Sequence, residues 1–236
     1  MGDPGRDNAI RPAGETNELA RRIGISRPSE SYRSRLTDSC GEPPGEPDEV
    51  DVARAQEYAL LAVLLARAPD AGLLERIARL HGDGTPLGVA HSALAQDANE
   101  ASADSVAREF FDLFIGVGRG ELLPYGSYYL TGFLNERPLA RLREDLRALG
   151  IERVETHCEP EDHAAILCEI MAGLIGGQFP AQVETQRQIF EKHLAPWIGR
   201  FFADMTVADA ADFYRHVGTV GNRFIEVERE AFALPG

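Results

Sequence analysis

The stretch DEVDVARAQEYALLAVLLARAP, residues 48–69, has the pattern that decides the fold. Its apolar residues recur every three or four positions, as they do on one face of an α-helix. Asp48 is a residue type that caps helices, and the acidic residues that follow it complement the positive end of the helix dipole. The stretch therefore predicts a helix that begins after Asp48 and ends before Pro69.

Patterns of the same kind recur along the rest of the chain. They cover residues 70–82, about 86–98, 102–115, 137–150, the segment after Pro160, 179–194 and about 207–232. No run of alternating β-branched and aromatic residues is long enough for a sheet. The sequence predicts an all-α fold, a single globular domain of about eight or nine helices.

Residues 1–47 differ in composition from the rest of the chain. They contain seven arginines, repeated Gly and Pro, and few large apolar residues. Such a segment buries too little surface to offset its ordering entropy, so we expect a flexible N-terminal tail before a helical domain at 48–236. The pair Arg21 and Arg22 is not followed by the apolar stretch of an export signal, and we expect no export of this chain by that route.

Charge and cysteine content exclude several classes of protein. The formal net charge of −14 disfavours a nucleic-acid-binding protein, because phosphate contact requires a basic face. No apolar run reaches the ~18 to 20 residues of a membrane span, so we expect no stable membrane insertion. Cys40, Cys158 and Cys168 lack CxxC spacing, which disfavours a disulfide framework and a cysteine zinc site and indicates a reducing compartment.

The sequence EPEDHAAILCEI, residues 159–170, has two interpretations. Pro160 suits the first turn of a helix, and Glu159, Glu161 and Asp162 would complement its dipole, which predicts a helix start here. A metal or acid/base site is less favoured, since Asp162 and His163 would point about 100° apart on a helix. We expect His163 to be neutral and hydrogen-bonded to a fixed partner, because a cation is disfavoured at a helix N-terminus.

The stretch GVGRGELLPYGSYYLTG, residues 116–132, shows no clear period and predicts a long ordered loop. It lacks the lysine and hydroxyl residue of a phosphate-binding loop. Its tyrosines, Tyr125, Tyr128 and Tyr129, either pack in the core with satisfied hydroxyls or form a recognition surface, and both interpretations stay open.

Several stretches together resemble the TorD/DmsD family of cytoplasmic redox-enzyme maturation chaperones. They are LLPYGSYYL, a helix that ends in LRALGIE, EPEDH before an apolar helix, HLAPW and the late FYRHVG, in this order and spacing. The resemblance covers about residues 52–232. The segment before Asp48 departs from it, because it is longer and richer in arginine than the family pattern.

The resemblance implies a cytoplasmic, non-catalytic protein with an all-helical, TorD-like fold. Its partner would be the precursor of a molybdopterin-dependent oxidoreductase, bound at its twin-arginine signal peptide and apoprotein while the cofactor is inserted before export. The resemblance implies no catalytic residue, no metal and no resident cofactor, and leaves weak binding of guanine nucleotide or molybdopterin guanine dinucleotide open. The protein would act as a monomer or a helix-swapped dimer, without nucleic acid.

The resemblance also assigns residues to the partner-binding site. Tyr125, Ser127 and Tyr128 would line a recognition loop, and the facing wall would consist of Glu159, Pro160, Asp162 and His163. Carboxylates beside tyrosines suit a peptide that presents two arginines next to an apolar stretch. The resemblance does not specify which molybdenum enzyme is the client.

Two alternatives come from other classes of protein. One is a small helical metal-dependent hydrolase that uses Asp162, His163 and a remote ligand such as His193 or Glu169. The other is a GTP-binding factor, for which the sequence shows no magnesium-binding Ser or Thr and no Walker lysine.

Overall fold

The computed structural model describes residues 25–26, 46–153, 159–179 and 181–234. The secondary-structure elements among these residues are all helices except for one short antiparallel pair, β1 (Ile25–Ser26) with β2 (Glu152–Arg153). The all-α prediction is confirmed. The predicted tail, residues 1–47, lies outside the described residues except for 25–26 and 46–47.

The described residues contain ten α-helices and two short π-helical segments, η1 and η2. In chain order they are α3 (Glu49–Ala66), α4 (Ala71–Ile77), α5 (Pro86–Glu100), α6 (Ala103–Phe110), η1 (Phe111–Ile115), α7 (Gly126–Thr131), α8 (Arg137–Ala148), α9 (Ala164–Ile175), α10 (Val183–Ile189), η2 (Phe190–Leu194), α11 (Ile198–Val207) and α12 (Phe213–Ala233). None of these helices is long and apolar enough to cross a membrane.

The first predicted helix begins as the sequence indicates. The Asp48 side chain accepts a hydrogen bond from the backbone N–H of Asp51 at 2.9 Å, which caps α3. The helix ends at Ala66, before Pro69. The last helix differs from its prediction, because α11 ends at Val207 and α12 begins only at Phe213.

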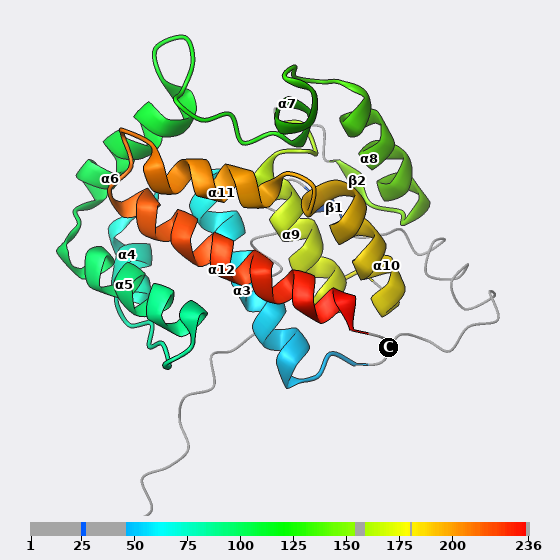
Figure 1. Ribbon diagram of the computed structural model, residues 1–236, viewed down its shortest axis with the longest axis horizontal. Helices are drawn as coiled ribbons and strands as arrows, with labels where there is room; N and C mark the ends of the chain where they lie inside the picture. The colour runs from blue at the N-terminus through cyan, green and yellow to red at the C-terminus, as the bar shows by residue number, and fades with distance from the viewer. Residues whose placement is uncertain (1–24, 27–45, 154–158, 180, 235–236) are drawn as a thin grey trace, which may run out of the picture.

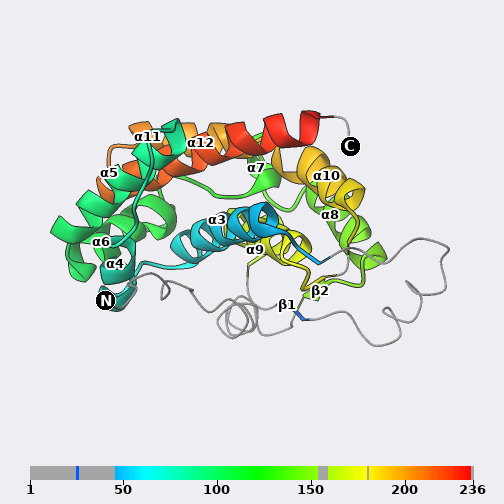
Figure 2. The same ribbon diagram turned by 90° about the horizontal axis from the view of Figure 1, so that it is seen from below.

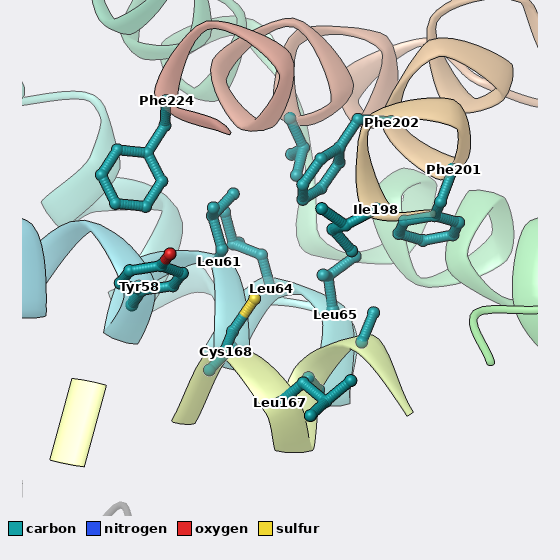
Figure 3. Packing of buried hydrophobic residues seen from close by; sticks show 14 of the residues in the cluster. Tyr58, Leu61, Leu64, Leu65, Leu167, Cys168, Ile198, Phe201, Phe202 and Phe224 are labelled. Carbon is teal, nitrogen blue, oxygen red and sulfur yellow. The ribbon is translucent and has the colours of Figure 1, made fainter. Parts of the chain in front are cut away.

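The core lies where α3 and α9 pack together beneath α11 and α12 (Figures 1 and 2). Figure 3 shows side chains from all four helices meeting there: Tyr58, Leu61, Leu64, Leu65, Leu167, Cys168, Ile198, Phe201, Phe202 and Phe224. Each is almost completely buried. Burying a large apolar side chain contributes about 1.5 to 3 kcal/mol, so this junction supplies much of the stability.

A glycine permits the close contact between α11 and α12. A Cβ atom at Gly221 would lie 2.5 Å from the ring of Phe202. The aromatic ring of α11 therefore fills the space that a side chain at this position of α12 would need.

Two carboxylates hold α12 near its two ends, one from α6 and one from α12 itself. The Glu109 carboxylate on α6 accepts three backbone N–H groups, from Asp212 at 2.8 Å, Phe213 at 3.1 Å and Tyr214 at 2.6 Å. Near the other end, Glu228 forms a buried ion pair with Arg54 of α3 at 2.6 and 3.0 Å. These contacts connect α12 to α6 and α3 in the first half of the domain.

Candidate functional site

The two segments that the sequence singles out lie side by side. Tyr125 and His163 form an antiparallel bridge, and their ring centroids are 5.1 Å apart. The N–H of Gly126 donates to the carbonyl of Asp162 at 2.9 Å, and the N–H of Ala164 donates to the carbonyl of Pro124 at 2.8 Å. We call residues 122–130 the tyrosine segment and residues 159–163 the acidic turn.

The helix predicted after Pro160 is present as α9 (Ala164–Ile175), but Pro160 does not lie in its first turn, so the predicted start is wrong. α9 begins at Ala164, with His163 as its N-cap. Pro160 lies in a turn, where its carbonyl accepts the N–H of His163 at 3.0 Å. The carbonyl of Asp162 and the N–H of Ala164 bond to the tyrosine segment, so the helix begins only after this bridge, and the carbonyl of His163 accepts its first helical hydrogen bond, from Leu167.

The stretch 116–132 is also not entirely a loop, because it contains the short helix α7. The Asp162 carboxylate accepts the backbone N–H of Ser127 at 2.7 Å, in the first turn of α7. This long-range cap replaces the local capping signal that the sequence lacks. Asp162 is 3% exposed, so its main part in the site is to fix the tyrosine segment from beneath.

His163 is buried and neutral, as the sequence predicts. Its Nδ1 accepts the backbone N–H of Ala165 at 3.1 Å, so the proton of the neutral ring is on Nε2. Burial lowers the pKa of His163 to about 4, although the nearby charges of Glu159 and Asp162 act in the opposite direction. The imidazole therefore adds no positive charge to the site at neutral pH.

Tyr125 positions the carboxylate of Glu159 at the surface. The Tyr125 hydroxyl donates to Oε2 of Glu159 at 2.5 Å. Burial raises the pKa of Tyr125 well above its ordinary value, and the hydrogen bond to Glu159 adds to this effect, so the hydroxyl stays protonated. Glu159 is exposed, and its Oε1 has no hydrogen-bond donor among the described residues.

A cavity of about 270 Å³ opens beside this pair of side chains. It is lined by Val63, Leu65, Ala66, Arg67, Phe110, Phe114, Ile115, Pro124, Tyr125, Glu159, His163, Ala165 and Ile166. We call it the first cavity. Its walls are mostly apolar, and its two charged lining residues are Arg67 and Glu159; we call the side with the Glu159 carboxylate the acidic edge. Such a cavity suits an apolar side chain that has a positive charge close to it.

The predicted site residues divide into three groups. Tyr125, Glu159 and His163 line the first cavity, and Ser127 and Asp162 are buried beside it. Tyr128 and Pro160 do not line it. The Tyr128 hydroxyl instead accepts a hydrogen bond from Arg119 at 2.7 Å, and the guanidinium lies 5.3 Å from the centroid of its ring.

Sequence reasoning missed the apolar wall of the first cavity. Phe110, Phe114 and Ile166 follow the helical period and resemble core residues. The wall includes part of η1, and π-helical segments are frequent at functional sites. The sequence shows no local signal for η1, because an apolar stretch such as FDLFI also fits an α-helix.

A second cavity of about 420 Å³ lies beside α7, α8 and η2. It is lined by Gly126, Leu130, Pro138, Arg141, Leu142, Glu144, Asp145, Asp162, Lys192 and His193. His193 is hydrogen-bonded to Asp145 at 2.7 Å, and its carbonyl accepts the Trp197 indole N–H at 2.7 Å. The HLAPW stretch thus supports this second cavity and the start of α7, where Gly126 lies against the Trp197 ring.

The geometry gives no support to the metal-dependent hydrolase. Within the part of the chain that the structure describes, no group of three or more His, Cys, Asp or Glu side chains could hold an ion. Glu169 is buried on α9, where neither oxygen has a partner among the described residues, and burial raises its pKa to about 7. Asp162 holds α7, and His193 is paired with Asp145, so the proposed ligands do not converge.

Comparisons with known proteins agree on one family. The family model described as nitrate reductase delta subunit matches residues 81–203. The chaperone protein TorD of Vibrio cholerae is 31% identical over 143 residues, which cover 57% of this chain and 64% of the relative. TorD of Aliivibrio fischeri is 29% identical over 133 residues, covering 52% and 62%.

One solved structure is also similar. It is a proposed redox enzyme maturation protein from Archaeoglobus fulgidus, with a TM-score of 0.48 and 19% sequence identity. The match covers 73% of this chain and 93% of that one.

Proposed function

This chain belongs to the TorD/DmsD family of redox-enzyme maturation chaperones, and from that premise we propose that it binds the precursor of a molybdopterin-dependent oxidoreductase. In the cytoplasm it holds the twin-arginine signal peptide and the apoprotein, and it assists cofactor insertion before export. The observation that supports this proposal most is the acidic edge of the first cavity, where Tyr125 holds Glu159 beside an apolar wall.

The acidic edge suits the arginines of a signal peptide. A carboxylate and a guanidinium form charge-assisted hydrogen bonds, each worth about 1.5 to 3 kcal/mol. Tyr125 occupies Oε2 of Glu159, which orients the carboxylate and leaves Oε1 for the guest. Because the His163 imidazole is neutral, it does not compete with the guanidinium of the guest for the negative charge of Glu159.

The apolar wall suits the stretch that follows the arginines. The first cavity has room for one or two apolar side chains, and Ile115 of η1, which lines it, exposes 54% of its surface. A guest helix or turn that buries apolar groups there adds about 25 cal/mol per Å². Together with an arginine contact at Oε1 of Glu159, we expect this burial to give micromolar affinity, about −8 kcal/mol.

The protein acts by binding and performs no reaction of its own in this proposal. The residues that would act on a bond, such as Asp162 and His163, are instead used to hold α7 and to cap α9. No resident cofactor takes part. Weak binding of guanine nucleotide or of molybdopterin guanine dinucleotide stays a prediction, which calorimetry with each ligand tests, and the oligomeric state is a question for light scattering.

Isothermal titration with a synthetic twin-arginine peptide tests the proposal. We expect micromolar binding to the wild type, about tenfold weaker binding after Glu159→Gln, and no binding of a peptide whose two arginines are replaced by glutamine. Glu230→Gln is the matched control, since Glu230 is an exposed glutamate on α12. Equal affinity of the protein for both peptides would contradict recognition of the two arginines.

A pull-down experiment tests whether the partner is the precursor of a molybdenum enzyme. Tagged protein incubated with its own cell lysate retains an immature molybdenum enzyme if the proposal holds. Retention by the wild type and loss after Glu159→Gln would connect the client to the first cavity. Retention of only mature, cofactor-containing enzyme would contradict the proposal.

A further inference from the structure

The first cavity carries two opposite charges that do not meet. Arg67 and Glu159 are its two charged lining residues, and both side chains are exposed, which places them where the cavity opens to solvent. No hydrogen bond or ion pair joins these two described side chains. The remaining lining residues are apolar except for Tyr125 and the neutral His163. A guest that enters the cavity therefore meets a carboxylate, an apolar wall and a guanidinium.

Arg67 differs from other arginines around the site. Three arginines that contact the tyrosine segment or the acidic turn are each held by a hydrogen bond within the chain: Arg119, Arg143 and Arg200. The chain leaves α3 at Arg67, whose extended backbone ends the helix. The Arg67 guanidinium has no hydrogen-bond or ion-pair partner among the described residues. Since a guanidinium binds carboxylates well, this unpaired group is available to an acidic group of a guest.

The size of the first cavity sets the spacing of the groups that it can bind. A sphere with its volume of about 270 Å³ is about 8 Å across. One turn of a guest helix rises about 5.4 Å and brings residues i and i+4 to the same face. A guest whose arginine meets Glu159 can therefore place the residue one turn later near Arg67, while the apolar side chains between them enter the cavity.

We propose that Arg67 selects client peptides by the charge of the residue about one helical turn after the arginine pair, favouring an acidic residue there and disfavouring a basic one. The inference rests on the function proposed above, because it assigns Arg67 to the same site. Glu159 attracts the arginines of the client, whereas Arg67 repels any further positive charge. The two charges also fix the direction of the client, since a reversed peptide would place its arginines next to Arg67.

The expected effect is modest because the Arg67 side chain is exposed. An exposed ion pair changes affinity by about two- to fivefold, and two like charges change it by a similar factor in the opposite direction. Replacing an acidic residue of the client with lysine combines both effects, so we expect about tenfold weaker binding. Salt at 1 M shortens the Debye length from about 8 Å to about 3 Å and should remove most of this difference.

The test measures three fluorescein-labelled peptides by anisotropy against three versions of the full chain: the wild type, Arg67→Glu and Arg108→Glu. Each peptide has two consecutive arginines followed by an apolar stretch, and the residue four positions after the second arginine is Glu, Gln or Lys. Arg108 is the matched control, since it is an exposed arginine on α6 that does not line the first cavity and whose guanidinium has no partner among the described residues. We expect the wild type to bind the Glu peptide about tenfold more tightly than the Lys peptide. Arg67→Glu should reverse this preference, and Arg108→Glu should keep it.

The outcomes separate this inference from the proposed function. Equal affinity of the wild type for the three peptides would overturn the inference and leave the proposed function intact, because Glu159 binds the arginines of all three. A preference of Arg67→Glu that matches the wild type would also overturn it, since another group would then select the charge. If the wild type binds none of the peptides, the proposed function fails and the inference fails with it. A preference reversed by Arg67→Glu and kept by Arg108→Glu supports the inference.

Discussion

The substitution Glu169→Gln should stabilise the protein at neutral pH and leave it unchanged in acid. Glu169 is 5% exposed, and neither carboxylate oxygen has a partner among the described residues. Burial raises its pKa to about 7, from an ordinary value of 4.5. Because the folded-state pKa lies above the unfolded one, the stability of the neutral acid is present below pH 4.5 and is lost as the pH rises through 7.

The size of the effect follows from this difference. Each pKa unit corresponds to about 1.4 kcal/mol, so ionising Glu169 costs the folded state about 3 kcal/mol at pH 7.5. Glutamine has the same shape and no charge, so the variant avoids this cost. Urea unfolding of both proteins at pH 4, 5.5 and 7.5 measures the difference.

We expect equal free energies of unfolding at pH 4 and an advantage of about 3 kcal/mol for Glu169→Gln at pH 7.5. The exposed Glu230→Gln should show no such trend. A difference between wild type and Glu169→Gln that does not change with pH would refute the reasoning, because Glu169 would then be ionised at no cost.

Three further predictions use the same unfolding assay. For His163 the folded-state pKa of about 4 lies below the ordinary 6.5, so the free energy of unfolding falls as the pH falls, by about 2 kcal/mol at pH 5. His163→Asn should remove this loss of stability. The same pH profile in wild type and variant would argue against a buried neutral ring. Glu109→Gln should cost about 1.5 to 3 kcal/mol, because it weakens the bonds to three N–H groups at the start of α12; a cost near zero would mean that water replaces them. Gly221→Ala should cost about 1 to 3 kcal/mol through its contact with the ring of Phe202, whereas Gly84→Ala, which meets no atom within 4 Å, should be nearly neutral.

The fold was predictable because its signals are local. The helical period and the cap at Asp48 specify α3 from its own residues. The all-α class follows because apolar residues recur at helical spacing in the other segments of the chain as well. Helix boundaries were less predictable where tertiary contacts decide them, as at α7, whose first turn is capped by a carboxylate 35 residues away in the sequence.

The candidate site was predictable in part. The resemblance placed Tyr125 and His163 in one site, and the structure brings their rings together. The local sequence of the acidic turn was misleading, because Pro160 and the acids around it suit the first turn of a helix. Only the pairing with the tyrosine segment shows that these residues form a turn. The wall from η1 was not predictable, because apolar residues that line a cavity and apolar residues that fill a core have the same period.

Photo-cross-linking of the twin-arginine peptide tests the central claim most directly. The peptide would carry a diazirine leucine in the apolar stretch after its arginines, and mass spectrometry would locate the cross-link. The account predicts attachment to the wall of the first cavity, at Phe114 or Ile166, and its loss after Glu159→Gln. Cross-links confined to the second cavity, at Leu130 or Leu142, would contradict it.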